Sequence, residues 1–183
     1  MPRFTITQQI PSILASNLLL GIDPGSQITG YGIITADANR PQHIASGSIR
    51  LVGKTLEQKL YDLYLKVQAL ITTHQPSEMA IEQVFYHKNV QSAFKLAQAR
   101  AIPLLLAGQY ALPVSEYTPR AVKQAVTGYG AADKLQIQKM VASRLKIATP
   151  LEADAADALA IALCHCQTRS LNVRLNQAIK ETS

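Results

Sequence analysis

The first third of the chain holds three strand patterns joined by short turn-forming segments, and this arrangement constrains the fold more than any other feature. Residues 17–23 (NLLLGID), 29–37 (TGYGIITAD) and 43–52 (HIASGSIRLV) are rich in β-branched and other apolar residues. The connections between them, DPGSQ and DANRPQ, contain Pro, Gly, Asp and Asn, which favour turns. Because connections this short join neighbouring antiparallel strands, we expect a three-stranded antiparallel meander.

Helices and strands alternate in the next part of the chain. Residues 55–74 repeat apolar side chains at helical spacing, with Thr55 in the N-cap position. A short strand is expected at 77–85 (SEMAIEQVF), and because a helix intervenes it should run parallel to the strand before it. The pattern at 112–117 (LPVSEY) predicts a fifth strand.

Four further helical patterns complete the layout: residues 89–110, residues 118–126, a segment after the glycine-containing loop at 128–133, and residues 152–166. Pro103 removes a backbone donor, so we expect the first of these helices to bend near Ile102 or to divide into two pieces. Thr118 and Gly128 have the residue types that begin and end the second. The order of elements predicts an α/β fold with a five-stranded mixed sheet flanked by helices.

The length of the chain, 183 residues, suits one compact domain with a hydrophobic core and is too short for two independent ones. Apolar residues make up 48% of the chain and charged residues 16%, which is an ordinary globular composition. We expect the folded domain at residues 17–168, a loosely ordered extension at 1–16, and a polar, weakly basic tail at 169–183.

Charge and apolar patterning bound the environment of the protein. Its net charge of +6, from 18 Lys and Arg against 12 Asp and Glu, favours an anionic partner such as nucleic acid. No apolar run reaches the roughly 18 residues of a membrane-spanning helix, and the N-terminus lacks a secretion signal, so we expect a cytoplasmic protein. Cys164 and Cys166 lie two apart in a helical pattern, which predicts inert thiols and not a shared metal site.

Four carboxylates occupy positions for which a purely structural role is difficult to supply: Asp23, Glu82, Asp154 and Asp157. Asp23 ends the first strand, and Glu82 lies in a strand among the apolar residues Met79, Ala80, Ile81 and Val84. If these two strands are neighbours, both acids meet at one end of the sheet. Asp154 and Asp157 are three residues apart and so share one face of the last helix. Packing of that helix over the same end of the sheet would bring all four together.

A cluster of this kind is costly without a counter-charge, because like charges and burial both disfavour ionised carboxylates. Oxygen ligands suit Mg²⁺ or Mn²⁺, and two such ions about 4 Å apart can stabilise the attacking and leaving oxygens of a phosphodiester. Taken singly, Asp23 can open a turn, and Asp154 and Asp157 can complement a helix dipole. Their conjunction in a basic chain instead predicts the metal site of a nuclease.

Several sequence blocks agree in order and spacing with a known family: GIDPGSQITGYGII, AIEQVF, KLAQARA, VKQAVTGYGAADKLQIQKMV and ADAADALAIA. Over about residues 19–167 the chain resembles the RuvC Holliday-junction resolvases of bacteria. The resemblance implies a ribonuclease H-like fold, a homodimer, and Mg²⁺- or Mn²⁺-dependent paired nicks in four-way DNA junctions, with two ions at each site when substrate is bound. It also implies the RuvA and RuvB branch-migration complex as a partner in recombination and repair.

The resemblance assigns catalysis and metal binding to the same four residues, namely Asp23, Glu82, Asp154 and Asp157. It implies that Phe85 engages bases near the junction point, where an exposed aromatic ring can stack. It further implies that Lys123 and Lys134 contact DNA phosphates or support catalysis. For four other basic residues a solvated helix face is the simpler interpretation: Lys88, Arg100, Arg120 and Lys139.

Three other functions are compatible with parts of the pattern. An actin-like or sugar-kinase-like ATPase also ends its first strand in Asp-x-Gly, but it needs a second domain and a second phosphate loop. A ribonuclease H-type nuclease with another substrate would cut linear duplexes or hybrids as readily as junctions. A junction-binding protein without cleavage would lack one of the four acids, and none is missing here.

Overall fold

Five strands form one mixed sheet in the computed structural model, which describes residues 17–83 and 90–181. In the order in which they lie in the sheet, the strands are β3 (His43–Arg50), β2 (Ile28–Thr35), β1 (Leu18–Asp23), β4 (Glu78–Glu82) and β5 (Val114–Tyr117). β2 pairs antiparallel with both β1 and β3, and β4 pairs parallel with β1 and β5. The predicted meander and mixed sheet are therefore confirmed. β4 runs parallel to β3 as expected, although its neighbour is β1.

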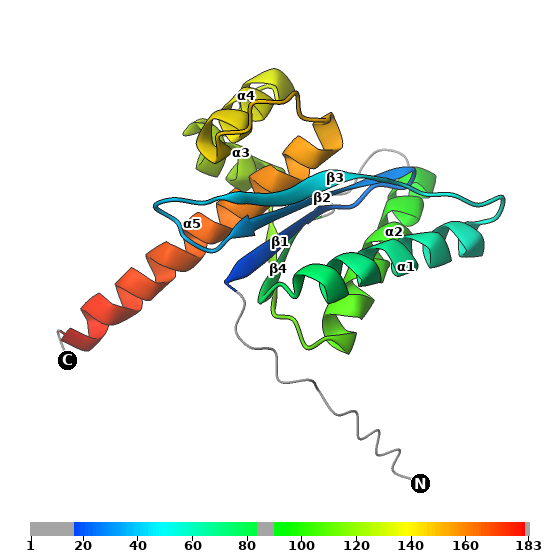
Figure 1. The fold of residues 1–183 in the computed structure, drawn as a ribbon, viewed down its shortest axis with the longest axis horizontal. Helices are drawn as coiled ribbons and strands as arrows, with labels where there is room; N and C mark the ends of the chain where they lie inside the picture. Colours follow the sequence, from blue (N-terminus) through cyan, green and yellow to red (C-terminus); the bar gives the residue numbers. More distant parts are fainter. Residues whose placement is uncertain (1–16, 84–89, 182–183) are drawn as a thin grey trace, which may run out of the picture.

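Helices cover both faces of the sheet (Figure 1). α1 (Leu56–His74) and α2 (Val90–Gln109) lie on one face, and α3 (Pro119–Thr127), α4 (Lys134–Leu145) and α5 (Ala153–Glu181) lie on the other. The sheet alternates its side chains between these two layers, as the period of a strand requires. In β1, Leu20 and Ile22 pack towards α1 and α2, whereas Leu19 packs beneath α5.

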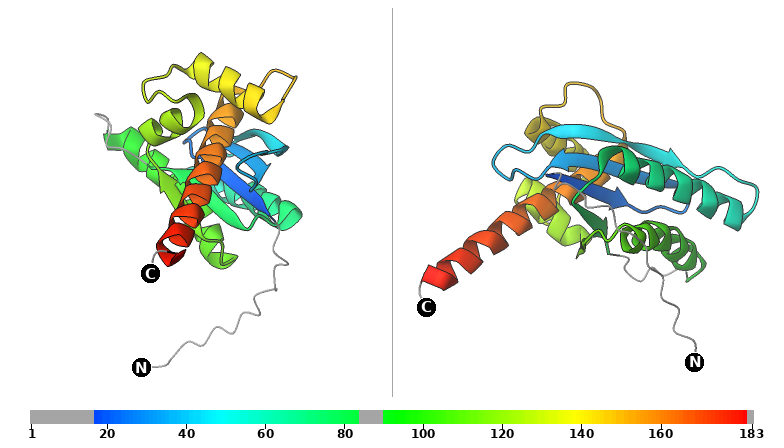
Figure 2. Two further views of the ribbon diagram at one scale, coloured as in Figure 1. Left: turned by 90° about the vertical axis from the view of Figure 1, so that its left-hand side faces the viewer. Right: turned by 60° about the horizontal axis from the view of Figure 1, so that its bottom comes forward.

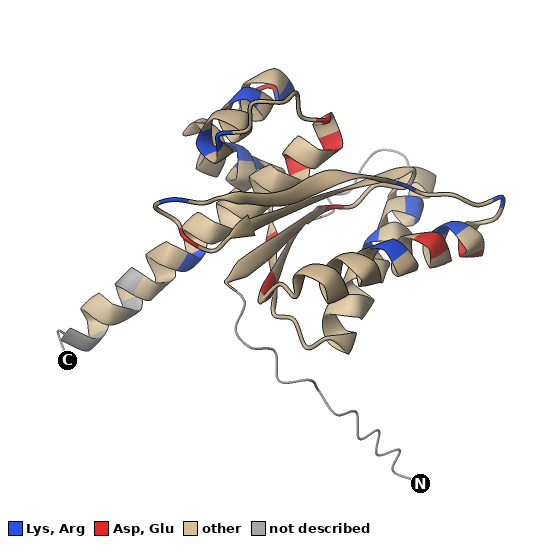
Figure 3. Ribbon diagram, viewed as in Figure 1, with Lys and Arg blue, Asp and Glu red and all other residues tan. Residues whose placement is uncertain are grey.

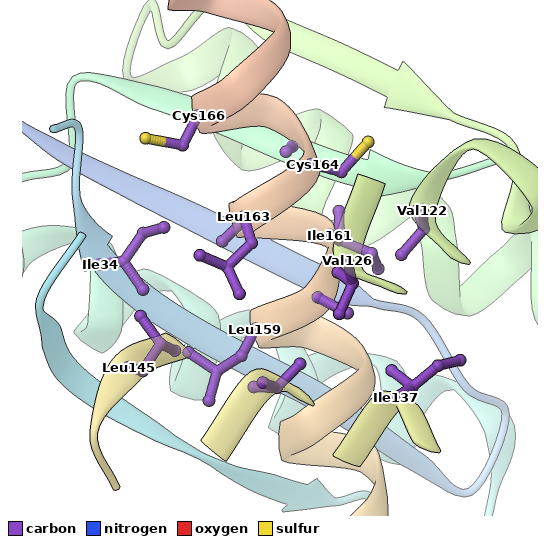
Figure 4. Packing of buried hydrophobic residues seen from close by; sticks show 14 of the residues in the cluster. Ile34, Val122, Val126, Ile137, Leu145, Leu159, Ile161, Leu163, Cys164 and Cys166 are labelled. Carbon is purple, nitrogen blue, oxygen red and sulfur yellow. The ribbon is translucent and has the colours of Figure 1, made fainter. Parts of the chain in front are cut away.

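The core under α5 joins three helices to the sheet. Leu159 and Leu163 of α5 are buried with Ile34 of β2, and Leu145 of α4 packs against the same cluster (Figure 4). From α3, Val126 completes the contact. Because α3 and α4 reach the sheet mainly through α5, the position of α5 decides where both of these helices stand.

Glycines let α5 approach the sheet far more closely than other residues would allow. A Cβ atom added at Gly21 of β1 would lie 2.2 Å from the carbonyl oxygen of Ala158. One added at Gly30 of β2 would lie 2.0 Å from that of Asp154. Real Cβ atoms do not come this close to backbone atoms, so α5 rests directly on the backbones of β1 and β2.

A buried polar network also ties α5 to the sheet, between Glu78 at the start of β4 and Tyr117 at the end of β5. The ring of His165, which is 4% exposed, contacts the Tyr117 hydroxyl through Nδ1 at 2.8 Å and Oε2 of Glu78 through Nε2 at 2.9 Å. Arg169 pairs with the other oxygen of Glu78 at 2.8 Å. Burial lowers the pKa of His165, and the neighbouring Glu78 opposes that shift. Each polar group is thus satisfied where it is buried, as such groups must be.

Local signals fix the starts of α3 and α4. Thr118 caps α3 by accepting a hydrogen bond from the Ala121 amide, and Gly128 ends the helix with a φ of 77°, both as predicted. Asp133 and Gln136 form a capping box in which each side chain accepts from the backbone amide of the other residue. This box fixes Lys134 as the first residue of α4.

At Pro103 the structure excludes one of the two expected outcomes. α2 is one continuous helix across this residue, so its division into two pieces is wrong. Pro103 is buried with Leu106 and Ala107 on the inner face of α2, where packing against the core compensates for the missing backbone donor.

α5 also differs from expectation, because it continues past Thr168 to Glu181 and extends beyond the sheet as a single rod (Figure 2). No Gly or Pro follows Pro150 in the sequence, so nothing in the chain stops the helix. The segment from residue 169 to Glu181 is helical and not an irregular tail. Whether it is separate from the domain at 17–168 stays a prediction, and residues 1–16 lie outside the described part.

Two further expectations concern the cysteines of α5 and the presence of membrane-spanning helices. Cys164 and Cys166 are buried free thiols, and burial raises the pKa of Cys164 to about 11, which keeps it protonated and unreactive. In the described ranges, no helix has both the length and the apolar character needed to span a bilayer.

We predict that Gly21→Ala lowers the free energy of unfolding by ~1–3 kcal/mol, because the added methyl group forces α5 away from β1. Urea denaturation measures the change. The control is Gly108→Ala in α2, where no described atom lies within 4 Å of the new Cβ, and it should preserve or raise stability. Equal stability of Gly21→Ala and the unmodified protein would show that α5 does not depend on this contact.

Candidate active site

Asp23 and Glu82 lie side by side at one edge of the sheet. β1 and β4 are parallel neighbours in which Ile22 pairs with Ile81, so the next residues of both strands are adjacent. Gly21 and Ala80 lie beneath α5, and strand alternation places Asp23 and Glu82 on that same face two residues later. β1 and β4 are therefore neighbouring strands, as the prediction from the sequence assumed.

The first turns of α5 bring Asp154 and Asp157 to this edge. The backbone of Asp154 rests against Gly30, which is the partner of Asp23 in the β1–β2 ladder. Asp157 follows one turn later on the same face of the helix. The close contact of α5 with the two glycines thus sets the position of both acids.

The electrostatics show that the four acids act on one another. The pKa of Asp23 is raised to about 7, first by burial and then by the charges of Glu82, Asp157 and Asp154. Burial, followed by the charge of Asp157, also raises the pKa of Glu82. For Asp157 burial raises the pKa, and Lys134 opposes the shift. Because burial and mutual repulsion disfavour the ionised carboxylates, a bound cation would stabilise their charged form.

Both predicted DNA-contacting lysines stand beside the acids. Nζ of Lys134 lies 3.6 Å from Oδ2 of Asp157, while its side chain is 82% exposed. Lys123 on α3 is close enough to lower the pKa of both Glu82 and Asp157. Figure 3 shows basic positions on α3 and α4 next to acidic positions at the start of α5. Phe85 and Lys88 fall outside the described residues.

Arg100 has a role that the sequence argument missed. Its Nε donates to the backbone carbonyl of Glu82 at 3.3 Å, and its guanidinium pairs with Oε2 of Glu116 at 2.7 Å. The side chain is 17% exposed, so a solvated helix face is the wrong interpretation. Arg100 ties α2 to the ends of β4 and β5, and its spacing from Glu82 gave no signal of this contact.

The donor set has the chemistry of a magnesium or manganese site. All four candidate ligands are carboxylates, and hard divalent cations prefer such oxygen donors. Within residues 17–83 and 90–181, no three His, Cys, Asp or Glu side chains already stand as they would around a bound ion. A bound cation would offset the repulsion among the four carboxylates, which contributes to the raised pKa of Asp23, Glu82 and Asp157. Their assignment as ligands stays a prediction.

The mixed five-stranded sheet, which matches two solved structures of Thermus thermophilus RuvC, places the protein in the ribonuclease H-like fold class. Comparison with known families then identifies the particular group. Residues 19–165 match the family model described as crossover junction endodeoxyribonuclease RuvC. The chain belongs to the RuvC family and is an endodeoxyribonuclease.

Individual relatives agree with this placement. The chain is 50% identical over 155 residues to the RuvC protein of Chromohalobacter salexigens, covering 85% of this chain and 83% of the relative. It is 48% identical over 159 residues to that of Aliivibrio salmonicida, covering 87% and 92%. The structure of Thermus thermophilus RuvC in complex with Holliday junction substrate matches with a TM-score of 0.80 at 26% identity, covering 85% of this chain and 96% of that one.

We predict that Asp23→Asn stabilises the metal-free protein at about pH 8 but not at about pH 4. The folded-state pKa of Asp23, about 7, lies above its ordinary value of 3.8. The protonated Asp23 carboxyl group therefore contributes its full stabilisation of the folded state below pH 3.8. This contribution is lost as the pH rises through 7. Because an amide does not titrate, the gain in melting temperature of the variant should grow over this interval. The corresponding gain in the free energy of unfolding has an upper bound of about 4 kcal/mol.

Thermal unfolding with a chelator present measures this difference. Asp37→Asn, in the exposed turn between β2 and β3, makes the same chemical change away from the acids and should give no such trend. A gain for Asp23→Asn that does not vary with pH would mean that the carboxyl group is not held in its protonated form by its surroundings.

Proposed function

We propose that this protein resolves four-way DNA junctions by metal-dependent hydrolysis of phosphodiesters. The observation that carries the proposal is the convergence of carboxylates from β1, β4 and α5 at one edge of the sheet, beside Lys123 and Lys134. Membership of the RuvC family supports the reaction, and the Holliday junction substrate bound by the Thermus relative supports the choice of DNA.

The metal would be Mg²⁺, or Mn²⁺ in its place, with two ions per site when DNA is bound. Four carboxylates would hold it: Asp23, Glu82, Asp154 and Asp157. When bound, such ions supply Lewis acidity and a water of lowered pKa. The chain itself provides rigid placement, because two of the acids end neighbouring strands and the other two lie on a helix seated against glycine.

Lysines on α3 and α4 would hold the DNA in place. Lys134 is exposed and contacts Asp157 only at 3.6 Å, so its ammonium group is free to turn towards a phosphate. Lys123 stands near the same acids from the neighbouring helix. Phosphate contacts of this kind orient the duplex without reading its sequence. We assign base stacking near the junction point to Phe85, on the strength of the resemblance alone.

A homodimer fits this function, because symmetric nicks need two active sites. The outer face of α2 carries an exposed stripe at intervals of three and four residues: Val90, Phe94, Ala97, Ala101 and Leu105. Phe94 is 65% exposed and Leu105 61%, and the alanines between them would allow a second helix to approach closely. We assign the dimer contact to this α2 stripe.

The proposed function also implies a cellular location and protein partners. Junction DNA in bacteria, the source of the relatives named above, lies in the cytoplasm, and we place the protein there. Partnership with the RuvA and RuvB branch-migration complex is implied by the resemblance and belongs to the same proposal.

We expect Asp23→Asn to reduce Mg²⁺-dependent cleavage of a synthetic four-way junction by at least about a hundredfold, because the site loses a ligand charge. Binding of the junction should remain, since the basic helices are unchanged. Cleavage of end-labelled DNA and a gel-shift titration give the two readouts, with Asp37→Asn as the control. Full cleavage by Asp23→Asn would refute the assignment of the site.

The substrate class is tested by comparing a mobile four-way junction, a linear duplex and an RNA–DNA hybrid. We expect cleavage of the junction alone, with Mg²⁺ and not with chelator. Equal cleavage of the linear duplex or of the hybrid would favour a nuclease with another substrate. Binding of the junction without cleavage would favour a structural role.

Leu105→Glu should convert the dimer to a monomer, because it places a charge in the middle of an apolar helix contact. Sedimentation equilibrium measures the change in mass. Leu135→Glu is the matched control, because Leu135 is similarly exposed, at 66%, but lies on α4. A dimer that persists in Leu105→Glu would place the contact elsewhere.

A further inference from the structure

A second basic site lies on the face of the sheet that α1 and α2 cover. A groove of about 220 Å³ opens there between the turn after β1, the loop after β3, the start of α1 and the middle of α2. We call it the α1–α2 groove. Its polar lining comes from seven residues: Ser26, Gln27, Lys54, Thr55, Lys59, Lys95 and Gln98.

The positive charge of this groove is not neutralised by neighbouring acids. Among the described residues, no carboxylate lies within ion-pair distance of Lys54, Lys59 or Lys95. Glu57, the acidic residue in the first turn of α1, does not line the groove. By contrast, Lys66 farther along α1 pairs with Asp62 at 2.7 Å. The α1–α2 groove therefore concentrates three unpaired ammonium groups.

The groove begins at the same edge of the sheet as the candidate active site. Ser26 and Gln27 belong to the turn that follows Asp23, and the Gln27 carbonyl accepts a hydrogen bond from the Leu51 amide at 3.0 Å. That bond joins the turn to the end of β3, which runs parallel to β1. Basic residues thus stand on both faces of the sheet, with the acidic edge between them (Figure 3).

The lining favours a phosphodiester backbone over bases. Ammonium groups contact phosphate as point charges, and amides and hydroxyls such as those of Gln98 and Ser26 can donate to phosphate or sugar oxygens. No aromatic side chain is among the residues that line the groove, so it offers no stacking surface for an unpaired base.

We propose that the α1–α2 groove binds the phosphodiester backbone of a DNA arm of the junction, on the opposite face of the sheet from Lys123 and Lys134. This inference rests on the proposed function. A duplex arm held here and a second segment held on α3 and α4 would cross the edge at which the acids stand. The contact is independent of base sequence and adds to the electrostatic part of binding.

The test is the triple variant Lys54→Gln, Lys59→Gln and Lys95→Gln, studied as the full chain. Each lost phosphate contact lowers the slope of log affinity against log salt by about 0.9, so the triple variant should lose roughly 2 to 3 units and bind a four-way junction about tenfold more weakly. Cleavage at saturating protein should remain. Lys66→Gln removes the same charge from α1 where it is already paired, and should leave the slope unchanged.

Ethylation interference gives the position of the contact. Phosphates on the junction arm whose ethylation blocks binding of the unmodified protein should cease to do so in Lys59→Gln. If the triple variant does not fold, Lys59→Gln and Lys95→Gln measured singly should each lower the slope by about one unit.

The outcomes separate this inference from the proposed function. Salt-dependent junction binding by the unmodified protein with an unchanged slope in the groove variants overturns the inference alone. Failure of the unmodified protein to bind or cut the junction overturns the proposed function. A reduced slope in Lys66→Gln equal to that of the groove variants would show a general loss of charge, and this too rejects the groove as a site.

Discussion

The contact between α5 and the glycines of the central strands is the constraint on which the rest of the structure depends. Gly21 and Gly30 let the helix rest on the backbone of β1 and β2. That depth brings Asp154 to the ladder position of Asp23, and it also sets the level at which α3 and α4 pack. The packing of the helices and the proximity of the acids thus have one cause. Where α5 crosses β1 and β2, both strands carry glycine and therefore no side chain.

Much of the fold and the centre of the site could be predicted from the sequence. Short connections dictated the meander, and helical periodicity located the helices, because both signals are local. Asp23 and Glu82 were identifiable because a carboxylate is unusual at the end of a buried strand or within one. The pairing of β1 with β4 could only be assumed at that stage, and the register of the two strands confirms it.

Other features could not be predicted, because they depend on contacts distant in sequence. Arg100 lies 18 residues from Glu82, and His165 lies 87 residues from Glu78, so no periodicity reveals either contact. Gly21 looks like an ordinary strand glycine until α5 is placed above it. Pro103 was expected either to divide α2 or to bend it, and the helix is not divided because tertiary packing outweighs the local propensity. The length of α5 was underestimated because polar composition suggested a tail, although no residue there stops a helix.

α2 combines an observed contact with the end of β4 and the proposed dimer contact on adjacent residues. Arg100 faces inward and holds the end of β4, whereas Ala101, the next residue, belongs to the outward α2 stripe assigned to dimer contact. Under the proposed assignments, substitutions at two adjacent positions of α2 affect the edge of the active site in one case and assembly in the other. Genetic screens of this family member would need to score oligomeric state and cleavage independently, since loss of activity from a change in α2 does not reveal which of the two has failed.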